Sequence, residues 1–185
     1  FFTKSVTNLC VTFNLLENLL QWSMLQTGRM PLRPKLVNIN ELVLENLELL
    51  KGNAHQKGIE LESNTIEDAM VFVDVSMITT VIRNLLSNAI KFTAQAGNIK
   101  IDMIKEDTKL KISIQDNGVG ISMQDMQRLF KIDSNPTSIG TSMEKGTGLG
   151  LILCKDFVER NGGNIWAESQ LGKGSTFYFT IPLVD

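Results

Sequence analysis

Two asparagines and a lysine recur at helical spacing within residues 76–92. Asn84, Asn88 and Lys91 lie at positions i, i+4 and i+7, so a helix would carry them on one stripe. An amide oxygen is a hard, neutral ligand that suits Mg²⁺, and a lysine ammonium is a point charge for phosphate oxygens. The stripe fits a metal-bound phosphate chain, and a solvated helix face is the alternative.

A carboxylate followed by two glycines ends the stretch 109–116, in which apolar and polar residues alternate. Asp116 has the parity of the apolar residues that would face inward. A carboxylate at the buried end of a strand needs hydrogen-bond donors, and Gly118 and Gly120 would let the backbone approach a ligand closely. A solvated turn is the alternative.

A glycine-rich turn, residues 146–150, opens a predicted helix over 150–161. A glycine turn that runs into a helix N-terminus offers backbone N–H groups to an anion, although it could also be a flexible joint. The preceding stretch, 131–145, has few apolar residues and is too long for a plain connection. We expect it to be disordered or to act as a lid.

Periodicity predicts the elements that would position these residues. One long helix over 3–27 has an apolar seam that needs partner helices, or else it packs on the following domain. Helices are predicted over 40–56, 76–92 and 150–161, with a short one from Ser122 to Phe130. Strands are predicted over 36–39, 59–62, 70–73, 98–105, 109–116, 164–169 and 175–183.

Composition excludes several functional classes. The 185 residues are 43% hydrophobic with a formal net charge of −2, which fits one domain with a full core plus an appended element. The chain has no basic tract for nucleic acid and no apolar run long enough to span a bilayer. Cys10 and Cys154 lack metal-ligand spacing, so a reducing, cytoplasmic compartment is expected. Because the chain begins without Met, we expect it to be part of a longer protein.

Taken in order, these motifs resemble those of the ATP-binding catalytic domain of sensor histidine kinases, within the GHKL ATPase superfamily. The matching stretches are Asn84–Thr93, Asp116–Ile121, Leu129–Phe130, Gly146–Leu151 and Gly172–Phe177. The resemblance covers roughly residues 35–185. Residues 18–26 resemble the second helix of the family's dimerisation and phosphotransfer hairpin, so we expect part of that hairpin in 1–30 and the ATP-binding domain in 35–185.

The resemblance implies an α/β fold of the two-layer α+β sandwich type. This Bergerat ATP-binding fold has a mixed sheet covered by helices on one face, here with an added N-terminal helix. The implied activity is transfer of the ATP γ-phosphoryl group to a histidine on a hairpin helix, and then to an aspartate on a response regulator. The implied cofactors are ATP and Mg²⁺.

The resemblance also assigns roles to individual residues. Asn88 would bind Mg²⁺ with Asn84 beside it, Lys91 would meet the phosphates, and Asp116 would accept a hydrogen bond from the adenine amino group. Asn88 and Lys91 would be the catalytic residues of this chain. The other residues implied to bind ATP are Phe92, Gly118, Gly120, Ile121, Phe130, Gly146, Thr147, Gly148, Leu149, Gly150 and Thr176, the last of them behind the adenine.

The family's phosphorylated histidine is not recognisable in this sequence. His55 is the chain's single histidine, and it lacks the acidic neighbour and the following proline of the family's acceptor motif. We therefore expect the acceptor on a hairpin helix outside this sequence, in the same or the partner subunit of a homodimer. Two alternatives are a chaperone- or topoisomerase-like ATPase, which would carry a glutamate where Asn84 stands, and an ATP-binding or partner-binding module without turnover. Anchoring of the parent protein in the inner membrane stays open.

Overall fold

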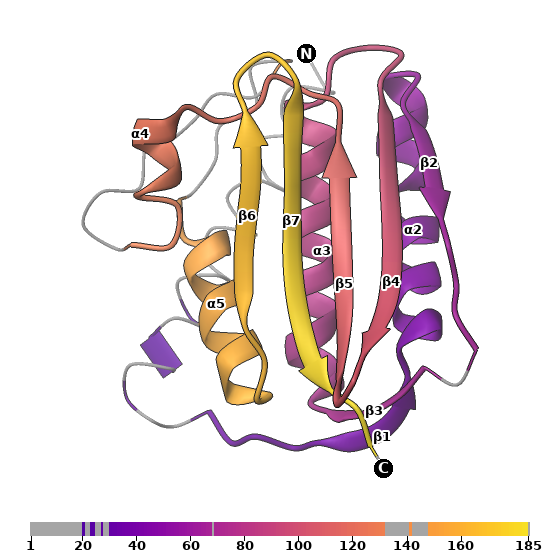
Figure 1. Cartoon of the computed structure of the whole chain (residues 1–185), viewed down its shortest axis with the longest axis vertical. Coiled ribbons are helices and arrows are strands. Elements are labelled where there is room, and N and C mark those ends of the chain that lie inside the picture. The colour runs from indigo at the N-terminus through magenta and orange to yellow at the C-terminus, as the bar shows by residue number, and fades with distance from the viewer. Residues whose placement is uncertain are drawn as a thin grey trace.

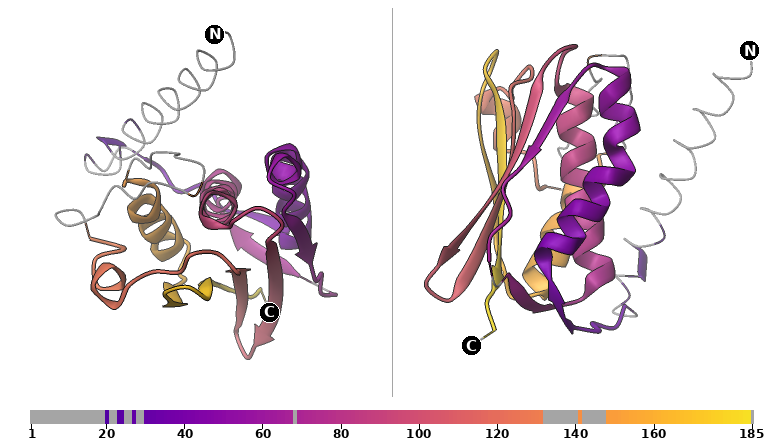
Figure 2. Two further views of the ribbon diagram at one scale, coloured as in Figure 1. Left: turned by 90° about the horizontal axis from the view of Figure 1, so that it is seen from above. Right: turned by 90° about the vertical axis from the view of Figure 1, so that its right-hand side faces the viewer.

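The computed structural model describes residues 20, 23–24, 27, 30–67, 69–131, 141 and 148–184. These residues form a helical layer on one face of a five-stranded sheet (Figure 1, Figure 2). The helices are α2 (Ile39–Gln56), α3 (Val75–Phe92), α4 (Met123–Met126) and α5 (Gly150–Arg160). The strands are β1 (Lys35–Asn38), β2 (Glu60–Ser63), β3 (Met70–Val73), β4 (Asn98–Glu106), β5 (Lys109–Asp116), β6 (Ile165–Gln170) and β7 (Gly174–Pro182).

The main sheet has the strand order β2-β4-β5-β7-β6. Strand β2 runs parallel to β4, and the other neighbouring pairs are antiparallel, so the sheet is mixed as expected. A separate two-stranded sheet pairs β1 with β3. Helices α2, α3 and α5 cover one face of the main sheet, which confirms the two-layer architecture (Figure 2).

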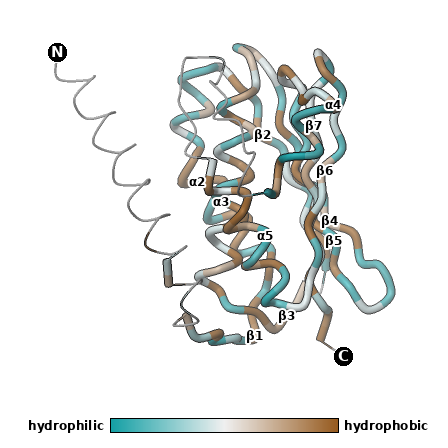
Figure 3. Tube along the Cα trace, turned by 90° about the vertical axis from the view of Figure 1, so that its left-hand side faces the viewer, coloured by the Kyte–Doolittle hydropathy of each residue, from teal (hydrophilic) through white to brown (hydrophobic). Residues whose placement is uncertain are grey.

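The core lies between the two layers because alternate residues of the central strands face the apolar side of α3. Leu110, Ile112 and Ile114 of β5 are buried, as are Leu85 and Leu86 of α3. Brown apolar stretches recur along both layers in Figure 3. Burial of this shared apolar surface is the main force that holds α3 against the sheet.

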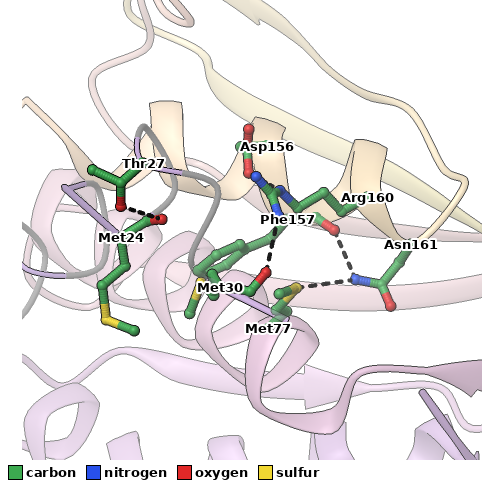
Figure 4. Close-up of polar contacts among 8 residues, drawn as sticks. All are labelled: Met24, Thr27, Met30, Met77, Asp156, Phe157, Arg160 and Asn161. Carbon is green, nitrogen blue, oxygen red and sulfur yellow. Dashed lines mark hydrogen bonds and ion pairs between the residues drawn. The ribbon is translucent and has the colours of Figure 1, made fainter. Parts of the chain in front are cut away.

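Helices α3 and α5 run antiparallel and are joined at one end by a buried asparagine. The Oδ1 atom of Asn161, which follows α5, accepts a hydrogen bond of 2.7 Å from the backbone N–H of Asp74. Asp74 itself caps α3 by accepting from the amides of Ser76 and Met77. The amide nitrogen of Asn161 donates to the carbonyl of Phe157 and contacts the Met77 sulfur (Figure 4).

The segment before β1 is attached at the same end of the helices. Arg160 is ion-paired with Asp156 and donates a 3.3 Å hydrogen bond to the carbonyl of Met30 (Figure 4). The backbone N–H of Arg33 donates to the Asp74 carboxylate at 2.9 Å. Both helices that carry predicted site residues are therefore tied to residues 30–33.

Most predicted elements are confirmed within one or two residues, and one is shorter than expected. Ser122 caps α4, but the helix ends at Met126 rather than at Phe130. After Met126 the amides of Arg128 and Lys131 bond to carbonyls three residues back, so the chain continues as tight turns. The predicted helix over 3–27 and the segment 131–145 lie largely outside the described residues, and the domain division at residues 30–35 stays a prediction. No helix in the described part is long and apolar enough to cross a membrane.

Candidate functional site

Asp116 ends β5 on the face that the helices cover, and its side chain is only 5% exposed. Its Oδ1 atom accepts hydrogen bonds from the backbone N–H of Gly118 at 2.9 Å and of Ser175 at 3.3 Å. Burial raises the pKa of Asp116, and these two bonds oppose the shift. Among the described residues Oδ2 has no donor, so this oxygen can accept a hydrogen bond from a ligand.

The two glycines after Asp116 are required by the protein's own packing. A Cβ at Gly118 would lie 2.3 Å from the carbonyl oxygen of Phe92, and a Cβ at Gly120 would lie 2.1 Å from that of Gln170. Gly120 also has a positive φ of 69°, which favours glycine. The close approach that was expected toward a ligand is made here to the end of α3 and to the β6–β7 turn.

The sheet register corrects the predicted position of Thr176. Asp116 pairs with Ser175 across β5 and β7, while Thr176 pairs with Gln115. Side chains alternate along a strand, so Thr176 faces the side of the sheet without helices, where it lines a shallow hollow with Gln115 and Tyr178. Thr176 therefore faces away from Asp116, which does not fit the expected place behind the adenine, whereas Ser175 lies on the same side of the sheet as Asp116. The signal was available, because Ser175 shares the parity of the buried Phe177.

The predicted stripe on α3 meets the start of α5. Asn84 and Asn88 are partly exposed on α3, and a Cβ at Gly150 would lie 3.3 Å from the Asn84 Oδ1. Helix α5 begins at Gly150 without a side-chain cap among the described residues. Its N-terminal amides and the positive end of its dipole therefore lie beside an amide-bearing helix, which suits an anion held next to a metal ion.

Most of the remaining predicted residues lie in described segments, and two of them lie outside the described residues. The ammonium of Lys91 lies 4.7 Å from the ring centroid of Phe92 at the end of α3. Ile121 and Phe130 pack against the core. Leu149 precedes α5, and Gly148 has a φ of 73°. Gly146 and Thr147 lie outside the described residues.

Sequence reasoning missed one polar cluster at the C-terminal end of α3. The hydroxyl oxygen of Thr141 lies 2.9 Å from the carbonyl oxygens of Lys91 and Thr93, so its single proton is donated to one of them at a time. The Lys57 ammonium contacts the same hydroxyl and donates to the Ile90 carbonyl, each at 2.9 Å. These contacts join residues far apart in the sequence, so no local pattern could have revealed them.

Residues 73–185 match the family model described as histidine kinase-, DNA gyrase B-, and HSP90-like ATPase. The chain belongs to this family. Curated members that it resembles include the sensor protein GacS of Pseudomonas syringae pv. syringae, 33% identical over 97% of this chain and 20% of the relative. Another is the sensor histidine kinase WalK of Bacillus subtilis strain 168, 34% identical over 80% of this chain and 24% of the relative. The chain thus spans a fifth to a quarter of these relatives.

Solved structures of this ATPase family have the same fold. The nucleotide-free catalytic domain of the histidine kinase ThkA superposes with a TM-score of 0.69 at 29% identity, covering 81% of this chain and 97% of that chain. A structure of ThkA in complex with the response regulator TrrA gives a TM-score of 0.76 at 26% identity, over 97% of this chain and 49% of that chain. The expected fold and family are therefore confirmed, and ATP is the nucleotide that the family implies.

Proposed function

We propose that this chain is the ATP-binding catalytic domain of a sensor histidine kinase. In this proposal ATP lies between Asp116, at the base end, and the α3–α5 junction, at the phosphate end. The observation that carries the proposal is the proximity of Asn84 to Gly150, since it brings two nucleotide-binding motifs distant in sequence to one place. Family membership and the kinase names of the relatives support the same reading.

At the base end the residues would act mainly by hydrogen bonding. Asp116 offers Oδ2 to the adenine amino group, and Ser175 lies beside it across the sheet. Ile121 would line the pocket, and the glycines hold the loop against α3 and the β6–β7 turn. A buried carboxylate that lacks a donor on one oxygen discriminates strongly between a ligand that supplies a donor and one that does not.

At the phosphate end the residues would position and neutralise charge, which is most of what phosphoryl transfer requires. Asn88 and Asn84 have the amide oxygens that suit Mg²⁺, and Lys91 supplies a positive charge.

The amides at the start of α5, with Gly148 and Leu149, would bind phosphate oxygens, and Gly146 and Thr147 are proposed to complete that turn. Mg²⁺, when bound, would neutralise phosphate charge. Phe92 and Phe130 would bound the site.

The phosphoryl group would move to a histidine on the phosphotransfer hairpin, outside this sequence, and then to an aspartate of a response regulator. His55 is exposed and lies in the last turn of α2, and it does not fit the acceptor motif. The complex of ThkA with a response regulator supports a partner of that kind. We propose that the hairpin also forms the homodimer, with residues 1–30 as part of it.

Two measurements on the 185-residue chain test this function. Isothermal titration calorimetry should detect binding of Mg-ADP and Mg-ATP, and the absence of heat at millimolar nucleotide would contradict the proposal. Addition of a separate hairpin fragment that bears the acceptor histidine, with γ-labelled ATP, should give an acid-labile phosphohistidine on the fragment. Binding without transfer would favour an ATP-binding module without turnover.

A further inference from the structure

Ser169 on β6 lies outside the nucleotide-binding motifs, yet it contacts the base end of the proposed site. It pairs with Ser175 across β6 and β7. Its hydroxyl oxygen accepts a 2.8 Å hydrogen bond from the backbone N–H of Ile121. The same oxygen lies 2.8 Å from the carbonyl oxygen of Gly174 and 3.0 Å from the hydroxyl oxygen of Ser175. Ser169 therefore joins the loop after Asp116 to the strand that carries Ser175.

Counting the available protons determines which atom is the donor in each hydrogen bond of this cluster. A serine hydroxyl has one proton and two lone pairs. The Gly174 carbonyl can only accept, so it takes the Ser169 proton, and the Ile121 amide occupies one Ser169 lone pair. The remaining Ser169 lone pair faces Ser175, whose hydroxyl must then be the donor. Each member of the cluster has a complementary partner, which strengthens the whole network.

We propose that Ser169 is a positioning residue that selects adenine by holding the Ser175 proton away from the nucleotide. This inference rests on the proposed function. With its proton directed to Ser169, the Ser175 hydroxyl can offer a ligand only a lone pair, and Ser175 is held beside Asp116 by its backbone N–H, which donates to Asp116 Oδ1. An end lined only by acceptors favours the amino group of adenine and repels the keto oxygen of a 6-oxopurine.

The test compares ADP with inosine diphosphate, which has a keto oxygen in place of the amino group. Calorimetry gives the ratio of the two dissociation constants for the 185-residue chain and its variants. Ser169→Ala frees the Ser175 hydroxyl to rotate and donate to a keto oxygen, so the preference for ADP should fall about tenfold, the effect of one or two hydrogen bonds. Ser169→Thr keeps a hydroxyl and should restore the ratio.

Ser113→Ala is the matched control. Ser113 is a half-buried serine on β5 whose hydroxyl donates to the Asp102 carbonyl at 3.3 Å, on the sheet face away from the helices. Its removal should leave the ratio unchanged. A purely structural role for Ser169 predicts that Ser169→Ala lowers the melting temperature and weakens both nucleotides equally, and this result would overturn the inference.

Ser175→Ala provides a second, independent arm. It removes the oriented hydroxyl but leaves the bond from Ile121 to Ser169, so the ratio should fall in this variant even if Ser169→Ala does not fold. In the Ser175→Ala background, Ser169→Ala should change the ratio no further. A wild-type chain that binds neither nucleotide overturns the proposed function and this inference together. If Ser175→Ala keeps the wild-type preference for ADP, the inference about Ser169 is overturned, while the proposed function is not.

Discussion

The two ends of the proposed site are built in different ways. At the base end, Asp116 and Ser175 are fixed by sheet register and by backbone hydrogen bonds, and both are buried. At the phosphate end, Asn84 and Asn88 are partly exposed side chains on α3, and Asn84 lies beside Gly150 at the start of α5. On the proposed function, selectivity for the base would come from the ends of two inner strands, whereas phosphate binding would depend on how two helices pack. Variants at the two ends should therefore differ in how much nucleotide affinity and how much folding stability they lose.

The largest effect is expected from Asp116→Asn, which replaces an acceptor with a mixed donor and acceptor at the buried end. We expect Mg-ADP affinity to fall about 100-fold, since a charged hydrogen bond is lost and a donor faces the adenine amino group. Because burial raises the pKa of Asp116, the buried charge costs stability at neutral pH, so the melting temperature should hold or rise.

Calorimetry and differential scanning fluorimetry measure the two quantities. Asp102→Asn is the matched control, because Asp102 lies on the other face of the sheet in an ion pair with Lys100. Unchanged nucleotide affinity in Asp116→Asn would contradict the assignment of the base end.

Asn88→Asp should reduce Mg-ATP affinity about tenfold, because it places a negative side chain beside the negatively charged phosphates and alters a neutral metal ligand. A fluorescent ATP analogue measures the change with and without Mg²⁺, and the ratio between the two conditions should also shift. His55→Ala should leave both values alone, since His55 is exposed at the end of α2. Wild-type binding by Asn88→Asp would show that the metal assignment is wrong.

Acidification should weaken ADP binding through Asp116, in addition to the effect of protonating the nucleotide itself. The unbound carboxyl of Asp116 has a raised pKa, and a donor from adenine favours the charged form. Affinity should be flat above that raised pKa and fall by at most about tenfold per pH unit below it. Asp116→Asn should lose this component, which separates it from protonation of the nucleotide. An identical pH profile for wild type and variant would refute the coupling.

Two glycine variants, one at each end of the site, are expected to have the smallest effects, one mainly on folding stability and the other mainly on ATP affinity. Gly118→Ala places a Cβ 2.3 Å from the Phe92 carbonyl and should cost about 2 kcal/mol of unfolding free energy, as overpacking does. Gly148→Ala forces alanine to a φ of 73°, a strain of about 1 kcal/mol, and should lower ATP affinity about fivefold. Urea denaturation and calorimetry separate the two losses, and equal stability loss in both variants would remove the proposed difference between the ends.

The sequence predicted what depends on local periodicity. Helix α3, strand β5 and the parity of Asp116 follow from spacings of 3.6 and two residues, and the structure confirms them. The reason for Gly118 could not be predicted, because its neighbour, Phe92, belongs to an element distant in sequence. The expected place of Thr176 came from motif alignment, whereas counting parity back from Phe177 would have given Ser175.

The buried contact between Asn161 and Asp74 has a mechanical consequence. Helix α5 is pinned at its C-terminal end, so a tilt of the helix has its greatest displacement at Gly150, about 16 Å away. A rotation of about 5° about that pivot would move the glycine by more than 1 Å relative to Asn84. Met30 and Arg33 are hydrogen-bonded at that C-terminal end of α5. A pull on the segment that precedes β1 would therefore produce its largest displacement at Gly150, the opposite end of the helix.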